Sequence, residues 1–519
     1  MNSIPRELRT DLVDDGMGQS QFIETRIIQP VNGWNGAGQG QIRFILPKQG
    51  ILQSDAYIKF QIQAGKAELF LPIIAGAYSP LDTATLYCGG YQIQQTRGLN
   101  HLLTLKEYYR TPHERDNKQS IRTGCFSGLM VDANQNPASQ GMTANAPGHW
   151  GVDTGTDYID EVIADSGGAT VSNARLINTD YRITTSSTTT PEWRIYLAQL
   201  FPILYSNKMP LGLFEKELSI VIDLTPDDIR GERTCVTNGT VWNVADSKSN
   251  IINPTLHLDL EFYDDPIGSP STMDKLKEIL DRGEKLVFTD NAFIISQQGA
   301  RANGVRSTTS VLLGLDHQVV RHLFLSTPHQ QDYSTPANNT NGMALLGDYY
   351  SQGSTINNTL QLNINSQPVY PNELNSDNKI FNQLSQVYQT PFKANAATTS
   401  FFGQVNNDGF GVVPGGANGV LDLNAIRITN KTLEGISTCG DVTTSKTELM
   451  GNAHYYGINL AKDYSNKLGT GTSISRVPVE LVYSDVGATT FIDAKRLLIW
   501  ANCERVMTIV GGKIMVSGS

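Results

Sequence analysis

Charged side chains are scarce in this sequence. Asp, Glu, Lys and Arg make up 17% of its 519 residues, whereas about a quarter is typical of globular proteins. Fifty acidic residues against forty basic ones give a net charge of −10. The most basic stretch, 275–285, is interleaved with acidic residues and resembles a solvated helix surface. Binding to phosphates requires clustered basic residues, so we expect no sequence-independent contact with nucleic acid.

Cysteines are few, and long apolar runs are missing. The five cysteines lie far apart and form no CxxC pair: Cys88, Cys125, Cys235, Cys439 and Cys503. This set argues against a disulfide framework and a cysteine-rich zinc module, and it favours folding in a reducing compartment. No run of 18 apolar residues exists, so we expect no membrane span. The polar N-terminus has no apolar core, so we expect no signal peptide.

Alternation of apolar and polar residues is the main structural signal that remains. It predicts half-buried strands with one apolar face, which are typical of sandwiches rather than of parallel α/β sheets. The runs that show it are 42–46, 56–62, 218–224, 256–262, 360–364 and 479–483.

Three helices are expected beside these strands. Residues 100–111 form an apolar stripe and stop at Pro112. Residues 273–282 follow a capping-box pattern of Ser271 and Asp274, and Gly283 suits the position after the helix. Residues 376–388 place apolar side chains on one helical face.

The two halves of the chain are built alike. A strand-like run with a Gly-Gly turn leads to the helix that ends at Thr111-Pro112, and 359–364 leads to the helix that ends at Thr390-Pro391. Tyr205-Ser-Asn-Lys208 recurs as Tyr464-Ser-Asn-Lys467. The repeated order predicts a duplicated β-sandwich of roughly 240 residues.

Motifs of known catalytic sites are absent from the sequence. It contains no G-x-S-x-G, HExxH or P-loop pattern. The glycines of 36–40 precede a strand rather than a helix, so they provide no helix N-terminus for an anion. Residues 132–143 begin like a calcium loop, but Pro137 and Thr143 stand where Gly and Glu are required. We therefore assign no catalytic, cofactor-binding or metal-binding residue and expect no enzyme.

One histidine cluster, His317, His322 and His329 with Asp316, is the best metal candidate. The odd spacing of His317 and His322 puts them on opposite faces of a regular strand. We therefore interpret them as strand-edge histidines and expect His257 to make an ordinary hydrogen bond. Carboxylates in 157–165 and at Asp264-Asp265 cannot be paired across space from the sequence, and an acid pair of a glycosidase would go unseen.

The layout resembles the double jelly-roll major capsid proteins of double-stranded DNA viruses, including Polinton-like viruses, virophages and large DNA viruses. The resemblance follows the strand, turn and helix of 86–111, then the segment 193–224 with Met209-Pro-Leu-Gly-Leu-Phe214, and the strand and helix of 256–283. In the second half it follows 360–388, then 455–461 and the small residues of Gly469–Arg476. The segment Met209–Phe214 lacks the aromatic-rich form that giant-virus members have at this place, and this difference favours a relative from a smaller virus.

The resemblance implies an all-β fold of two consecutive eight-stranded jelly-roll sandwiches with short helices and long surface loops. The expected divisions are an N-terminal arm at 1–20, a first jelly roll at 21–268 with an insertion at 116–190, a connecting helix at 269–284, and a second jelly roll at 285–519 with loops at 326–358 and 389–452. The long polar loops would face outward and form contacts between subunits.

The implied function is a structural subunit of a virion. It would form pseudo-hexagonal homotrimers that tile an icosahedral shell around double-stranded DNA, after synthesis and assembly inside the host cell. Its partners would be itself, neighbouring capsomers, and penton and minor capsid proteins, without sequence-specific binding of nucleic acid. Whether a membrane lies beneath the shell is a question that the sequence leaves open. The alternative is a carbohydrate-binding or glycoside-hydrolysing β-sandwich protein, and a phage tail protein or adhesin is third.

Overall fold

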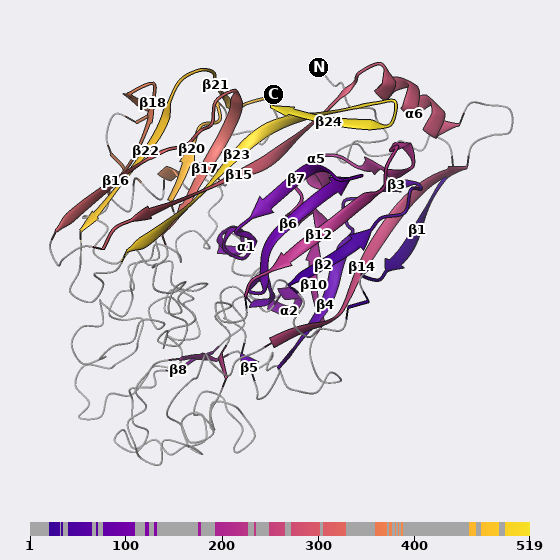
Figure 1. Cartoon of the computed structure of the whole chain (residues 1–519), viewed down its shortest axis with the longest axis horizontal. Coiled ribbons are helices and arrows are strands. Elements are labelled where there is room, and N and C mark those ends of the chain that lie inside the picture. The colour runs from indigo at the N-terminus through magenta and orange to yellow at the C-terminus, as the bar shows by residue number, and fades with distance from the viewer. Residues whose placement is uncertain are drawn as a thin grey trace, which may run out of the picture.

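The computed structural model shows two β-sandwiches side by side (Figure 1). The structure describes residues 20–31, 33–34, 40–64, 69–70, 76–108, 120–123, 129–131, 175–177, 192–226, 233–234, 249–264, 271–300, 305–327, 359–370, 373–375, 379, 382–383, 386–387, 456–462, 469–486 and 494–518. Within these residues, no helix is long and apolar enough to cross a membrane.

The first unit is a jelly roll. Its eight main strands are β1 (Ser20–Ile28), β2 (Gln41–Ile45), β4 (Tyr57–Ala64), β6 (Leu81–Cys88), β7 (Tyr91–Arg97), β10 (Glu192–Tyr196), β12 (Leu218–Leu224) and β14 (Ser249–Asp264). One sheet has the order β1-β14-β4-β10 and the other β2-β12-β6-β7. Numbered along the chain, the eight strands are arranged 1-8-3-6 and 2-7-4-5, which is the jelly-roll order. The short strands β3 (Ile51–Leu52) and β11 (Met209–Pro210) extend the first sheet beside β14.

The second unit repeats this order strand by strand. Its main strands are β15 (Lys285–Gln298), β16 (Arg306–Leu312), β17 (Gln318–Ser326), β18 (Thr359–Ile364), β19 (Gln367–Pro368), β20 (Tyr456–Asn459), β22 (Val479–Val486) and β23 (Lys495–Val510). They form sheets β15-β23-β17-β20 and β16-β22-β18-β19. The predicted fold of two consecutive jelly rolls is therefore confirmed.

Smaller strands complete the described part. In the second unit, β21 (Thr472–Ile474) pairs with β17, and β24 (Lys513–Gly518) pairs with the last residues of β23. Two short pairs stand apart from the sandwiches: β5 (Leu69–Phe70) with β13 (Arg233–Thr234), and β8 (Leu129–Val131) with β9 (Arg175–Ile177).

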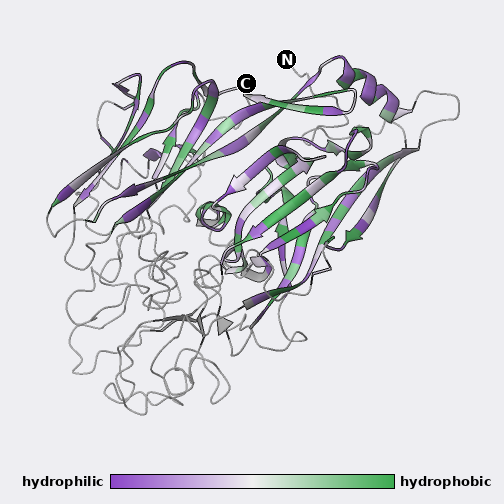
Figure 2. Cartoon of the chain, viewed as in Figure 1, coloured by the Kyte–Doolittle hydropathy of each residue, from purple (hydrophilic) through white to green (hydrophobic). Residues whose placement is uncertain are grey.

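Alternating side chains build both cores, as the green and purple bands along the strands show (Figure 2). In β2, Ile42 and Phe44 are buried while Gln41 and Arg43 are exposed. The prediction of a single buried face is wrong for β12, where Ser219 and Val221 are buried as well. β12 lies between β2 and β6 in the middle of its sheet, so side chains of neighbouring strands flank its side chains on either side.

Two of the three expected helices are confirmed. α1 spans Leu99–Tyr108 and α6 spans Thr272–Asp281. Ser271 caps α6 by accepting a hydrogen bond from the backbone N–H of Asp274, and Gly283 follows with φ +88°. The Asp274 carboxylate accepts a hydrogen bond from the Ser271 hydroxyl at 2.6 Å, so these two side chains also pair directly. Of the third helix, the described residues 379, 382–383 and 386–387 are helical.

Short helices went unpredicted: α2 (Ser120–Thr123), α4 (Leu197–Leu200), α5 (Ile203–Ser206) and the 3-10 turns η2 (Gly76–Tyr78) and η5 (Leu211–Leu213). Elements of three or four residues are too short to show a helical period.

The two matching hairpins have different turn residues. Gly89 and Gly90 connect β6 to β7 with φ of +54° and +91°. Asn365 and Ser366 connect β18 to β19 with φ of +53° and +60°. A positive φ at both central residues is the requirement of a tight hairpin turn. The repeated Tyr464–Lys467 segment lies outside the described residues.

Candidate functional site

The histidine cluster does not come together as a metal site. His322 lies within β17 and is buried, whereas His317 precedes the strand, has φ +59° and is exposed. Burial, aided by the charge of Arg321, lowers the pKa of His322 to about 4. The strand-edge interpretation is therefore wrong for His322, because β17 is enclosed by β20 and β23. His329 lies outside the described residues, among which no three His, Cys, Asp or Glu side chains could hold a metal ion.

The other candidates from the sequence carry no site in the part of the chain that the structure describes. The loops at 132–143 and 157–165 lie outside it, as do most of 36–40. Asp264 ends β14, and Asp265 is not described. His257 hydrogen-bonds through Nε2 to the Thr255 hydroxyl at 3.2 Å and stacks on Tyr57, as an ordinary surface histidine does.

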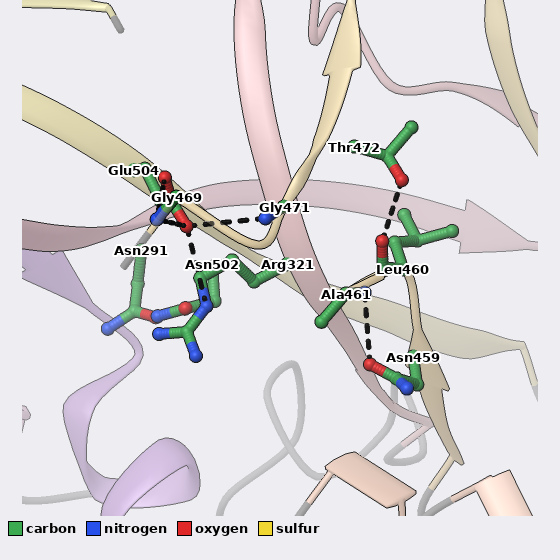
Figure 3. A network of polar contacts seen from close by, with 10 residues as sticks. All are labelled: Asn291, Arg321, Asn459, Leu460, Ala461, Gly469, Gly471, Thr472, Asn502 and Glu504. Carbon is green, nitrogen blue, oxygen red and sulfur yellow. Dashed lines mark hydrogen bonds and ion pairs between the residues drawn. The ribbon is translucent and has the colours of Figure 1, made fainter. Parts of the chain in front are cut away.

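A buried carboxylate holds the stretch Gly469–Arg476 against the second unit (Figure 3). Glu504 of β23 accepts the backbone N–H of Gly469 at 2.9 Å and that of Gly471 at 3.4 Å. The Nε atom of Arg321 lies 3.6 Å from the same carboxylate, and both side chains are buried. A Cβ on Gly471 would lie 2.6 Å from Cγ1 of Val319, so only glycine fits there. The small residues of this segment thus allow close packing on β17.

A second buried ion pair ties the ends of β22 and β23. Nζ of Lys495 lies 2.7 Å from Oδ2 of Asp485, and both side chains are fully buried. The Tyr483 hydroxyl also donates to Asp485, at 3.4 Å. Buried charges need such partners because leaving one alone in the interior is costly. This pair and the Glu504 contacts stabilise the second unit.

Polar side chains of the first unit hold the edge of the second unit. β15 is the edge strand of its sheet, and the carbonyls of Val287 and Thr289 accept hydrogen bonds from Nδ2 of Asn207 and Nε2 of Gln94. The other end of the Gln94 amide accepts the backbone N–H of Ile203 at 3.1 Å. Since unpaired backbone groups at a sheet edge invite pairing with other chains, these side chains protect the edge.

Aromatic packing fills the same junction. The rings of Trp500 and Phe293 stack at 5.3 Å, next to Gly98 at the end of β7. The Trp500 indole donates to the Arg97 carbonyl at 2.9 Å. A Cβ on Gly98 would lie 3.0 Å from the indole, and its φ is +59°. The close approach of the two units therefore depends on glycine at this position.

The C-terminal hairpin closes the junction at its other end. Gly512, in the turn between β23 and β24, accepts the backbone N–H of Glu215 at 2.8 Å. The neighbouring Gly511 N–H donates to Asp281 in α6 at 2.7 Å. The Tyr91 hydroxyl accepts the N–H of Val516 at 3.3 Å. The hairpin thus contacts the first unit and the helix that precedes the second.

Sequence reasoning missed nearly all of these junction residues. Gln94 and its acceptor Thr289 are separated by 195 positions, and no periodic pattern connects them. Only the repeat that contains Asn207 pointed to one of them.

Several large apolar side chains are exposed along one strand of the first unit. In β1, the side chains of Phe22, Ile23 and Ile27 are 53%, 61% and 61% exposed. β1 is the edge strand of its sheet and pairs with β14 along its whole length of nine residues. We call this surface the β1 edge.

Comparison with known proteins places the fold. No family model and no curated protein sequence matches the chain. The tandem of jelly rolls is, however, the fold of viral major capsid proteins. The VP54 structure of PBCV-1, fitted into a reconstruction of the virophage Sputnik, has a TM-score of 0.50 at 12% identity and covers 98% of this chain and 99% of its own.

Two further structures agree. The structure of the Sputnik virophage has a TM-score of 0.53 at 14% identity and covers 98% of this chain and 90% of its own. The Faustovirus major capsid protein has a TM-score of 0.50 at 9% identity, with 96% and 92% covered. The likeness spans both jelly rolls, and it was predicted from the sequence.

Proposed function

We propose that this chain is a major capsid protein, a structural subunit without catalytic activity. Three copies would form one capsomer, and capsomers would tile an icosahedral shell around a double-stranded DNA genome in the virion. The observation that carries the proposal is the repetition of one strand order in both units. Three copies with two similar units each supply six similar bodies, which is what a pseudo-hexagonal tile requires.

The interior of the chain supports a structural role. Two ionisable side chains in the described core have strongly shifted pKa values because they are buried. Burial lowers the pKa of His101 to about 3 and raises that of Cys503 to about 12. His101 lies in α1 close to Arg496, and Cys503 lies in the centre of β23. Neither belongs to a metal-binding group, since the described residues contain none. These groups stay uncharged, as core residues do.

The proposal includes the expected organisation and partners. Residues 1–20 would form an arm, 21–268 and 285–519 the two jelly rolls, and 269–284 the connection. The loops at 116–190, 326–358 and 389–452 would face outward or contact other subunits. Besides itself, the chain would bind penton and minor capsid proteins.

The test is the mass of the purified chain by size-exclusion chromatography with light scattering. The proposal expects a particle of three times the 56.8 kDa of one chain. A monomer at all concentrations, or a monomer that hydrolyses or binds a glycan, would contradict it.

A further inference from the structure

The junction within one chain connects two particular strands. β15 is the first strand of the second jelly roll, and its edge lies against β7, the fifth strand of the first jelly roll. Gln94 of β7 spans the gap to the Thr289 carbonyl and to the Asp290 carboxylate. The junction thus joins the 1-8-3-6 sheet of one unit to the 2-7-4-5 sheet of the other.

The same two kinds of edge occur once more in the chain. β1 is the first strand of the first unit and pairs with the eighth strand, β14, as β15 pairs with β23. β19 is the fifth strand of the second unit and ends the sheet β16-β22-β18-β19, as β7 ends the sheet β2-β12-β6-β7. Gln367 and Pro368 of β19 are exposed. β1 is therefore the counterpart of β15, and β19 is the counterpart of β7.

These two counterparts are uncovered in the described part of the single chain. Along β15, Leu286 and Phe288 are fully buried, only Ile295 among the large apolar side chains is more than half exposed, and the edge carbonyls accept hydrogen bonds from the first unit. Along β1, by contrast, three large apolar side chains are more than half exposed. A nine-residue edge strand with exposed apolar residues is a surface that proteins normally cover.

We propose that the β1 edge of one copy packs against β19 of a second copy and so repeats between chains the junction of β15 with β7. This inference rests on the proposed trimer and names its contact surface. Because the two edges differ, the contact is head-to-tail, and such contacts form rings when the rotation closes. A second copy is the occupant that the internal repeat specifies, since the chain itself shows how a first strand fits a fifth strand.

The number of these surfaces matches the proposed ring of three copies. Each copy offers one β1 edge and one β19, so three copies in a ring use all of them. The ion pair between Arg26 and Glu24 on β1, at 2.7 Å, places charges among the exposed apolar residues of this edge and limits unspecific pairing.

The first test replaces the exposed apolar residues of β1 by charges. The double variant Ile23→Asp, Ile27→Asp is expected to raise the concentration at which half of the protein is trimeric by roughly tenfold or more. Met515→Asp is the matched control, because Met515 is 57% exposed but lies on β24. The control is expected to form trimers as the wild type does. Circular dichroism and thermal melting of each variant check that the fold is retained.

The second test does not depend on disruption. Ile27→Cys and Gln367→Cys are combined in one chain and treated with a short homobifunctional maleimide. A ladder up to a covalent trimer on a denaturing gel, absent from the wild type and from either single variant, supports the contact.

The outcomes separate the two proposals. If the wild type is a trimer that gives no such ladder and tolerates the charged β1 edge, the inference is overturned and the capsid proposal stands. If the wild type is a monomer at all concentrations, the capsid proposal fails and the inference fails with it.

Discussion

The indole Nε1 of Trp500 donates a hydrogen bond to the backbone carbonyl of Arg97, 403 positions earlier in the chain. This bond joins the last main strand of the second jelly roll to the end of β7 in the first. Trp500 is fully buried and stacks on Phe293. The relative placement of the two units is thus fixed by packing as well as by the connecting helix.

Replacing Trp500 should weaken the protein in two steps. Trp500→Phe removes the hydrogen bond but keeps an aromatic ring, and we expect a loss of about 1 kcal/mol in the free energy of unfolding. Trp500→Ala also leaves a cavity, and we expect a loss of about 3–5 kcal/mol. Urea unfolding followed by circular dichroism measures both. Ile295→Ala is the control, because Ile295 lies on β15 two residues after Phe293 but is mostly exposed, and the loss in unfolding free energy should be much smaller. Equal losses for Trp500→Ala and Ile295→Ala would contradict the account.

Adjacent glycines in the C-terminal turn should respond differently to alanine. A Cβ on Gly512 would lie 2.9 Å from the backbone nitrogen of Glu215, whereas a Cβ on Gly511 meets nothing within 4 Å. Both residues have positive φ, so both variants carry the strain of a left-handed residue, about 1 kcal/mol. Gly512→Ala should cost clearly more, because the first unit must move away. Thermal melting of the two variants compares them, and equal melting temperatures would refute the close contact.

The buried pair of Lys495 and Asp485 should show strong coupling. Lys495→Met alone leaves the Asp485 carboxylate in the interior without this ammonium group, and we expect a loss of about 3–5 kcal/mol. Adding Asp485→Leu should recover much of that loss, because a hydrophobic pair of similar volume packs without buried charge. A double-mutant cycle from urea unfolding measures the coupling. Additive losses would show that the two side chains do not interact.

Two buried histidines should make the protein sensitive to acid. Burial lowers the pKa of His101 to about 3 and that of His322 to about 4, from an ordinary value of 6.5. The unfolded chain therefore binds protons at these residues at a higher pH than the folded chain does. Stability should fall as the pH drops from 6.5 toward 4, by up to about 1.4 kcal/mol per pH unit for each histidine.

Variants isolate this effect from other titrating groups. In His322→Gln, the difference in unfolding free energy between pH 6.5 and pH 4 should be smaller than in the wild type. His317→Gln is the control for the loss of a histidine side chain, since His317 is exposed rather than buried. An unchanged slope in His322→Gln would show that His322 is already charged in the folded protein.

Local patterns were sufficient to predict many of the main strands, though not β1, β15 or β16, and the similar build of the two units. The alternation in 42–46 and 56–62 reflects which side chains face the core, and this is a property of neighbouring residues. The cap of α6 was visible for the same reason, because Ser271, Asp274 and Gly283 act within one or two helical turns.

The junction could not be predicted in this way. Gln94, Asn207 and Trp500 find their partners on strands that are distant in sequence, and a polar or aromatic residue has no periodic signal for such a partner. The burial of His322 likewise depends on the strands beside β17 rather than on its own neighbours. The internal repeat is the one sequence signal that reached across these distances.

Electron microscopy of the purified, trimeric particle tests the central claim most directly. Class averages should show six similar lobes around one threefold axis, because each of three chains contributes two jelly rolls of the same strand order. Particles with two, four or any number of lobes other than six would contradict the assignment as a capsid subunit.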